Sequence, residues 1–496
     1  MKKFLALLLV IVMVAAVFVG CAKDNQDPSN SQAPASSGNE QPSNEPVNSD
    51  EIVDLKWITV GNGMPENYDA WKANLDKYLE EKIGVHLSFE VIPWGDWDTR
   101  RNVIVSTNEP YDIIFGNNGT YTGDINLGAL ADMSGLLNTV PGLTDLIPED
   151  YWKSLEVGGK IYGVPTYKDS SATQYFIYDE NLVKETGLDY ENAHTMEAVT
   201  PILKAMYEKK GEAVFILNKG GLDAIYGKNY DDLSLGFPAI GVSYKNGEAK
   251  AVSVFEQDDI KADLATLRSW YQAGYVNSDA AVLDEAPKYR PCFVAQGWSA
   301  AAKTTWGPNM KADAVAIQWG DTVMSNSTVQ GSINSVSASC KYPEKALKLL
   351  ELVNTDSYVR DALYYGLEGD NFTYTADGKV VVDDTKSWGM AGYTQGTFFD
   401  VSYKEGDNSN QWAELQALNA QAVASPALGF AFDQSNVTDE IKACKAIFDE
   451  YRPILMTGAA DPTETINTML SAMRDSGFDK ILTEVQTQLN AWVASK

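Results

Sequence analysis

The side chains that could do chemistry in this chain give little support to catalysis. Only two histidines, His86 and His194, occur among 496 residues, so a Ser-His-Asp triad is improbable. The sequence holds no H-E-x-x-H pattern, no Walker sequence and no C-x-x-C pair. A turn at Gly61-Asn62-Gly63 begins like a dinucleotide fingerprint, but Glu66 stands where the third glycine belongs and would repel a pyrophosphate. We therefore expect a protein that is not an enzyme and that uses no cofactor or metal.

Aromatic and amide side chains, by contrast, stand where a ligand could use them. Several of the 12 tryptophans and 25 tyrosines fall in loops after predicted strands rather than on apolar stripes. An aromatic ring offers a flat apolar face to the C–H groups of a sugar, and neighbouring amides can bond its hydroxyls. The predicted ligand-binding residues are Asn62, Glu66, Trp94, Trp97, Asn117, Asn118, Tyr167, Asp169, Trp298, Trp306 and Trp388. Trp298 is expected to face the pair Trp94 and Trp97 across a cleft.

The elements that must position these side chains alternate between strands and helices. Apolar patterns predict strands over residues 55–60, 85–91 and 111–115, separated by helices over 67–83 and 98–106. Such alternation is typical of an α/β protein with a parallel sheet. Further helices are predicted over 259–273, over 343–353 and from 439 onward. Another helix is predicted to start at Thr200-Pro201. Hairpin turns are predicted at Asn246-Gly247 and Asp377-Gly378.

The first fifty residues have the pattern of an exported, lipid-anchored protein. Lys2 and Lys3 precede an apolar run over residues 4–19, which is shorter than the roughly 20 residues of a membrane-spanning helix. Gly20-Cys21 then resembles a bacterial lipobox, whose cysteine receives acyl chains such as palmitate. Residues 1–20 are therefore predicted to be a lipoprotein signal peptide. Residues 21–50, rich in Ser, Asn and Pro, are predicted to form a disordered tether.

Charge narrows the class of partner. Asp and Glu number 68 against 39 Lys and Arg, a formal net charge of −29. An acidic chain repels phosphate backbones and anionic lipid surfaces, so nucleic-acid binding is not expected. The expected location is the outer face of the cytoplasmic membrane, where Cys21 would anchor the chain through lipid.

Several segments together resemble the extracellular solute-binding proteins of bacterial ABC importers, in particular a large oligosaccharide-type subgroup distantly similar to maltose-binding protein. The similar segments are residues 159–165, 176–182, 267–276, 365–370 and 425–432. The resemblance implies an α/β fold of two lobes that hinge around a ligand held in the cleft between them. Chain crossings are expected near residues 167–173, 321–328 and 366–370. Lobe one would then comprise 51–170 and 326–366, and lobe two 171–325 and 367–496.

The resemblance also implies a function: capture of a carbohydrate, with an oligosaccharide favoured, for delivery to ABC permease subunits in the membrane. Alignment by context with the second-lobe Gly-x-Trp segment of maltose-binding protein favours Trp298 as a stacking residue. Two alternatives stay open at this point. One is the same fold binding a peptide or another organic solute, and the other, less favoured, is a surface glycoside hydrolase.

Overall fold

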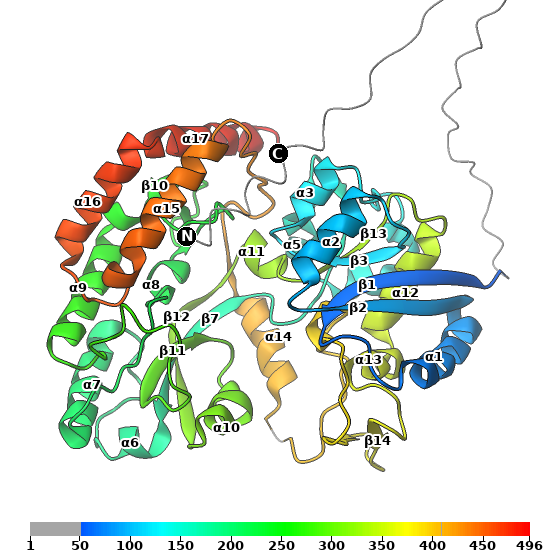
Figure 1. The fold of residues 1–496 in the computed structure, drawn as a ribbon, viewed down its shortest axis with the longest axis horizontal. Coiled ribbons are helices and arrows are strands. Elements are labelled where there is room, and N and C mark those ends of the chain that lie inside the picture. Colours follow the sequence, from blue (N-terminus) through cyan, green and yellow to red (C-terminus); the bar gives the residue numbers. More distant parts are fainter. Residues whose placement is uncertain (1–50, 408) are drawn as a thin grey trace, which may run out of the picture. The chain divides into compact units, whose positions relative to one another are not determined.

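A computed structural model describes residues 51–407 and 409–496. The predicted signal peptide, the tether and Cys21 lie outside the described residues. The described chain forms two α/β lobes joined by short crossings (Figure 1), as the resemblance implies. Each lobe has its own large apolar core, one around Trp57 and Trp71 and the other around Phe215 and Trp270.

Lobe one is built on a five-stranded sheet. Its order is β2 (Val85–Pro93), β1 (Val53–Gly61), β3 (Ile113–Gly116), β13 (Ile333–Val336) and β6 (Val164–Pro165). The three strands predicted from sequence are present and pair in parallel, with Val53 opposite Val85 and Trp57 opposite Ile113. β13 and β6 complete the sheet by antiparallel pairing. The carboxyl ends of β1, β2 and β3 therefore meet at one edge, where ligands bind in α/β sheets.

Helices cover both faces of this sheet. One face carries α1 (Tyr68–Ile83), α12 (Pro343–Thr355) and α13 (Ser357–Tyr364), and the other carries α2 (Trp97–Ser106) and α3 (Tyr121–Asn126) (Figure 1). The α1 stripe of Trp71, Leu75 and Leu79 is buried, and the helix ends at Gly84 in the left-handed conformation. Lobe one thus has the layered form that the alternating pattern predicts.

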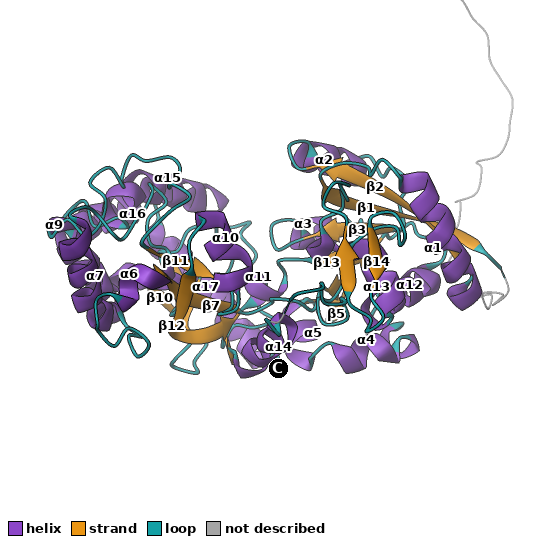
Figure 2. Cartoon of the chain, turned by 90° about the horizontal axis from the view of Figure 1, so that it is seen from below, coloured by secondary structure: helices purple, strands orange, loops and turns teal. Residues whose placement is uncertain are grey.

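Lobe two has a smaller, mostly antiparallel sheet of order β11 (Cys292–Gln296), β7 (Ala172–Asp179), β12 (Ala314–Met324) and β16 (Val423–Ala424). Around it stand α6 (Glu180–Lys184), α7 (Met196–Lys210), α9 (Asp258–Gln272), α10 (Gly307–Met310), α15 (Thr438–Leu455), α16 (Pro462–Asp475) and α17 (Phe478–Ala494) (Figure 2). A second sheet joins β8 (Tyr230–Asp231), β9 (Ile240–Ser243) and β10 (Ala251–Ser253). The predicted hairpin at Asn246-Gly247 is confirmed by the antiparallel pair β9 and β10.

Two crossings lie where the sequence predicts them. Residues 166–171 connect β6 to β7, and residues 325–332, including α11 (Asn326–Val329), connect β12 to β13. The third is elsewhere, because residues 366–370 stay with lobe one: the Asn67 amide donates to the Asp370 carboxylate and to the Asn371 side-chain oxygen. The chain enters lobe two only after α14 (Gln411–Gln421), at β16.

The segment between α13 and β16 therefore differs from its expected place in lobe two. Gly61 of β1 bridges Met390, and Thr59 shares a 2.9 Å hydrogen bond with Thr394. The predicted hairpin at Asp377-Gly378 is present as β14 (Phe372–Tyr374) and β15 (Val380–Val382). This hairpin, the adjoining loops and α14 share a small core of their own, formed by Tyr365, Phe372, Val380, Phe398, Val401, Trp412, Leu415 and Leu418. We call residues 364–421 the bridging segment.

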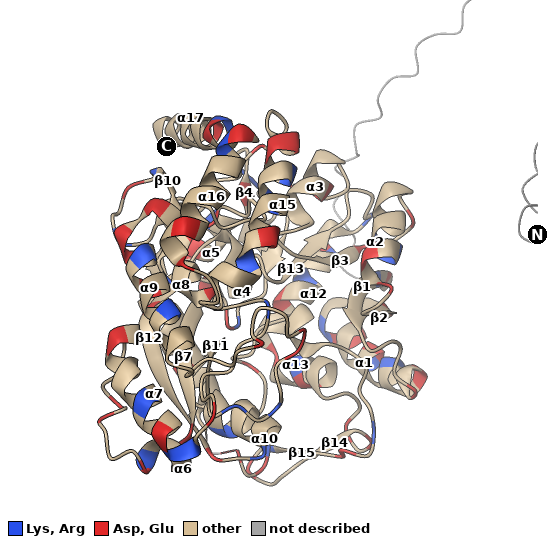
Figure 3. Ribbon diagram, turned by 60° about the vertical axis from the view of Figure 1, so that its left-hand side comes forward, with Lys and Arg blue, Asp and Glu red and all other residues tan. Residues whose placement is uncertain are grey.

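Two further features describe the surface. Lys and Arg are interspersed with Asp and Glu over the helices of both lobes rather than gathered in one patch (Figure 3). Among the described residues, no helix combines the length and the apolar character needed to span a bilayer.

Candidate functional site

An aromatic pair, exposed Trp94 and half-buried Tyr393, stands at the carboxyl edge of the lobe-one sheet. Trp94 follows β2 and is 50% exposed. Its indole Nε1 donates at 3.1 Å to Oδ1 of Asn62, the residue that directly follows β1. Its ring stacks on Tyr393 of the bridging segment, with 6.3 Å between centroids and 15° between planes. Because this ring is held on one side and open on the other, it can receive an apolar ligand face.

A lysine of the first crossing contacts the Tyr393 ring of this pair. The Lys168 ammonium lies 5.7 Å from the centroid of the Tyr393 ring and donates to the Asp169 carboxylate at 2.6 Å. Burial raises the pKa of Tyr393 above its ordinary value, so its phenol stays protonated at neutral pH. The pair thus presents the phenol of Tyr393 beside an aromatic face, while the indole N–H of Trp94 is already bonded to Asn62.

A buried arginine fixes the loop that carries Tyr393. Arg360 of α13 has no exposed surface, and it donates to the carbonyl oxygens of Gly392 at 2.6 Å and Thr397 at 2.5 Å. Burial lowers the pKa of its guanidinium to about 10, which leaves it charged at neutral pH. The sequence analysis missed this residue, although an arginine inside the apolar stripe of Val359 and Leu363 is the signal that marks it.

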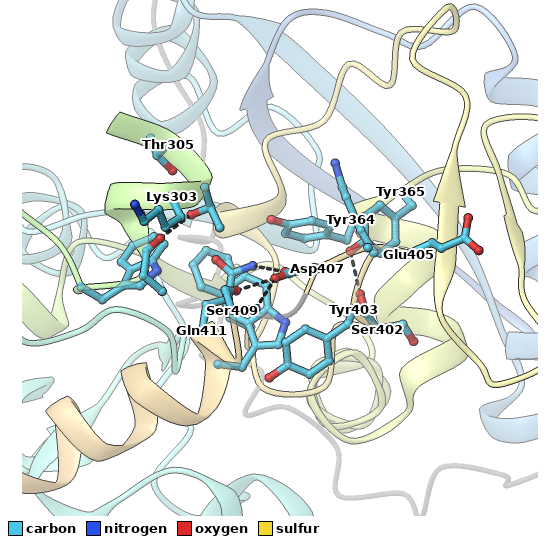
Figure 4. A pocket seen from close by; sticks show the side chains of 17 residues that line it. Lys303, Thr305, Tyr364, Tyr365, Ser402, Tyr403, Glu405, Asp407, Ser409 and Gln411 are labelled. Atoms are coloured by element: carbon cyan, nitrogen blue, oxygen red, sulfur yellow. Dashed lines mark hydrogen bonds between the residues drawn. The ribbon is translucent and has the colours of Figure 1, made fainter. Parts of the chain in front are cut away.

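A cavity of about 980 Å³ lies between lobe two and the bridging segment. Figure 4 shows Lys303 and Thr305 on one side of it and Tyr364, Tyr365 and Tyr403 on the other. Its lining is rich in aromatic rings: Trp298, Tyr364, Tyr365, Phe398, Tyr403 and Trp412. We call it the aromatic cavity. A space of this size suits a ligand of several sugar rings.

Two indole N–H groups of the aromatic cavity have no hydrogen-bond partner among the described residues. They belong to Trp298, which is half-buried, and to Trp412, which is 8% exposed. A buried donor without a partner costs free energy, and both of these nitrogen atoms are buried away from the cavity surface. Burial raises the pKa of Tyr364 and Tyr365, so their phenols remain protonated. What the cavity offers a ligand is therefore chiefly its aromatic ring faces.

A carboxylate of α14 holds the Trp298 loop in place. Glu414 accepts from the backbone N–H of Ser299 at 2.6 Å and of Ala300 at 3.0 Å. Trp298 packs against the core of the bridging segment. Lobe two and the bridging segment are thus tied together at the cavity wall, which fixes the position of the indole.

The other predicted site residues do not line the aromatic cavity. Trp97, Tyr167 and Trp388 pack in the interior: Trp97 against Phe115, Tyr167 against Tyr151 and Phe399, and Trp388 against Trp71. Trp306 lies against Tyr175 and against Gly297, the residue before Trp298.

Of the remaining three, Asn117 accepts from the backbone N–H of Gly119 at 3.0 Å and so shapes the turn after β3. Glu66 is exposed, and Asn118 lines a second cavity. The structure thus brings Asn62 and Trp94 together and places Trp298 in the aromatic cavity.

Comparison with known proteins gives the fold a family. Residues 61–360 match the family described as bacterial extracellular solute-binding protein, and residues 426–494 match a domain of unknown function. A carbohydrate ABC transporter substrate-binding protein of Streptococcus pneumoniae serotype 4 is 28% identical over 461 residues, covering 89% of this chain and 91% of the relative.

Solved structures of solute-binding proteins match the fold of this chain. The N-glycan transport solute-binding protein NgtS of Streptococcus pneumoniae matches with a TM-score of 0.79 at 27% identity, covering 89% of this chain and 99% of that one. The same protein in complex with Man5GlcNAc matches with a TM-score of 0.66 over the same shares. A binding protein from Bifidobacterium longum infantis, 16% identical with a TM-score of 0.60, shares the fold over 88% of this chain and 99% of that one. The family match spans more than half of the chain, which therefore belongs to the bacterial extracellular solute-binding proteins.

Proposed function

We propose that this protein captures an oligosaccharide in the aromatic cavity and along the lobe edge at Trp94, and delivers it to an ABC permease. The observation that carries the proposal is the aromatic cavity itself, with six aromatic side chains in its lining. Sugar rings present C–H faces that stack on such rings. Lys303 and Lys404 in the lining are matched by Glu405 and Asp407, which favours a neutral ligand.

The relatives support the same class of ligand. One curated relative is a carbohydrate substrate-binding protein, and NgtS is an N-glycan transport protein with solved glycan complexes. The two NgtS structures compared above have the same identity to this chain but different TM-scores, so they differ in conformation. We propose that ligand binding also changes the arrangement of the lobes in this protein.

Of the residues predicted from sequence, we assign ligand contact to Asn62, Trp94 and Trp298. We assign supporting roles to the interior group, Trp97, Tyr167 and Trp388, and to Trp306, Asn117 and Asp169. To the ligand-contact group we add Tyr393 and Trp412, which the sequence analysis did not single out.

Truncation of Trp298 tests the proposal. Trp298→Ala removes a stacking face and is expected to weaken oligosaccharide binding by about 2 kcal/mol, which is roughly thirtyfold in Kd. Trp298→Phe keeps a ring but loses the indole N–H, so we expect a smaller loss. Isothermal titration with Man1GlcNAc and Man5GlcNAc measures both, and unliganded melting shows whether the variants are folded.

The control for this test is the wild-type protein titrated with peptides of similar size. Binding of peptides without binding of glycans would replace the oligosaccharide by a peptide as the ligand. Hydrolysis of a bound glycan would show an enzyme. Unchanged glycan affinity in Trp298→Ala would remove the aromatic cavity from the binding site.

We further propose that the chain is anchored at the outer face of the cytoplasmic membrane through lipid on Cys21. The lipobox pattern and the apolar run before it support this proposal. Cys21→Ala is expected to move the protein from the membrane fraction to the soluble fraction or to leave it unprocessed. Fractionation and mass spectrometry of the mature N-terminus measure the change. A wild-type protein cleaved elsewhere, with a free amine and no lipid, would contradict the anchor.

A further inference from the structure

A second cavity, of about 550 Å³, is lined by residues of both lobes and of the second crossing. Lobe one supplies Asn118, Thr122 and Asn126 to its wall, the second crossing supplies Asn326 and Gln330, and lobe two supplies Ser234 and Gln434. We call it the amide cavity. Its lining contains Glu156 and Asp433 but no lysine or arginine. Such a surface repels anions and suits a neutral ligand rich in hydroxyl groups.

The carboxyl edge of the lobe-one sheet connects the bridging segment to the amide cavity. The sheet order β2, β1, β3 places Trp94, Asn62 and Asn118 one after another along this edge. Trp94 stacks on Tyr393 of the bridging segment, other residues of which line the aromatic cavity, and Asn118 lines the amide cavity together with residues of α3 and α5 (Glu149–Ser154). A chain of sugars that follows this edge therefore leads from the bridging segment to Asn118, directly after β3.

The lobe-two wall of the amide cavity is held in an unusual conformation. Leu233 and Ser234 both have positive φ, 54° and 56°. Their backbone N–H groups donate to the Asp231 and Asp232 carboxylates at 3.0 Å, which fixes the turn. Consecutive non-glycine residues in this region cost free energy, and such strain persists where the surroundings enforce it. The wall is thus a preformed surface.

We infer that the amide cavity is a second subsite, which holds the far end of a neutral oligosaccharide whose first sugars occupy the aromatic cavity. The inference rests on the proposed function and deepens it. A glycan of two sugars fits within the aromatic cavity alone, whereas one of six sugars is expected to extend beyond it into the amide cavity. The amide cavity then provides selection for length, because only a long or branched glycan can use its donors and acceptors.

Filling the amide cavity tests this assignment. Gly123 of α3 lines it, and a Cβ built there meets no atom within 4 Å, so Gly123→Trp introduces bulk without a clash at its root. The matched control is Gly135→Trp, at a glycine outside both cavities that is equally open. We expect Gly123→Trp to raise the Kd of Man5GlcNAc at least tenfold and to change that of Man1GlcNAc less than twofold. Gly135→Trp should change neither.

A second variant keeps the test decisive if the tryptophan disturbs folding. Asn126→Ala combined with Gln434→Ala removes two polar side chains of the amide cavity, with Asn102→Ala on the exposed face of α2 as its control. It should weaken Man5GlcNAc selectively, though less than the tryptophan does. An equal loss for both glycans, or no loss for either, in the variants that melt like wild type would overturn the second subsite. If wild type binds both glycans, the proposed function stands whichever way this result falls; if it binds neither, the proposed function itself fails.

Discussion

Replacing Trp97 with alanine is expected to lower the free energy of unfolding by about 3–5 kcal/mol. The indole is 7% exposed and packs at 5.6 Å on the ring of Phe115, so its removal leaves a cavity in lobe one. The matched variant is Trp94→Ala, three positions earlier. Because that ring is half-exposed and packs only on its Tyr393 side, we expect little change in stability.

Denaturant unfolding of the two unliganded variants measures the difference in their free energies of unfolding. Glycan titration of Trp94→Ala measures its effect on binding. Trp94→Ala should melt like wild type and bind more weakly. Equal stability of the two variants would mean that Trp97 is not an interior residue. A Trp94→Ala protein that binds glycans normally would remove the sheet edge from the proposed binding path.

The second large effect concerns a buried ion pair. Arg101 of α2 and Asp124 of α3 are 2% and 7% exposed at their side chains, and Arg101 also donates to the carbonyl oxygen of Phe115. Asp124→Ala leaves a guanidinium buried without its counter-ion, so we expect a loss of about 3–5 kcal/mol in the free energy of unfolding. The pair joins the two helices on one face of the lobe-one sheet, and α3 contributes to the amide cavity.

Two further variants show whether the loss of stability comes from the unpaired buried charge. Asp449→Ala breaks an exposed pair with Lys445 on α15 and should cost less than about 1 kcal/mol. Arg101→Met combined with Asp124→Leu removes both charges and should recover a large part of the loss, since apolar pairs can replace buried ions. A loss in Asp124→Ala as small as that in Asp449→Ala would show that the buried charge is well solvated.

Local patterns predicted the first part of the fold well. The alternation of Val85, Leu87, Phe89 and Val91 correctly predicted β2, and Gly84 correctly marked the end of α1. Trp97 shows where a finer interpretation was possible. With Arg101, Ile104 and Val105 it forms one buried helical stripe, at spacings of four, seven and eight residues. That spacing separates it from Trp94, which precedes the helix.

The helix predicted to begin at Thr200-Pro201 shows a different limit. α7 begins at Met196, after Thr195, whose side chain accepts from the backbone N–H of Ala198. Pro201 lies inside the helix. Two Thr residues therefore competed as N-caps, and Pro201 did not mark the helix start, since it lies in the second turn without ending the helix.

The bridging segment could not be placed from the sequence. Many of its rings, among them Tyr393, Phe398 and Tyr403, follow neither a helical nor a strand period, so no pattern indicates which lobe they contact. Their positions depend on partners distant in sequence, such as the carbonyl groups held by Arg360. Most of the aromatic cavity comes from this segment, and for this reason the sequence pointed to only one of its six aromatic residues, Trp298.

The return of the bridging segment to β1 also sets the order in which the protein can fold. Thr59 and Thr394 are hydrogen-bonded across 335 positions, and β13 inserts between β3 and β6 after all of the first part of lobe two has been made. A growing chain that ends before residue 333 therefore presents β3 as an open sheet edge. The first lobe to be synthesised is completed late, and such distant contacts slow folding, so the unfinished chain depends on protection from aggregation.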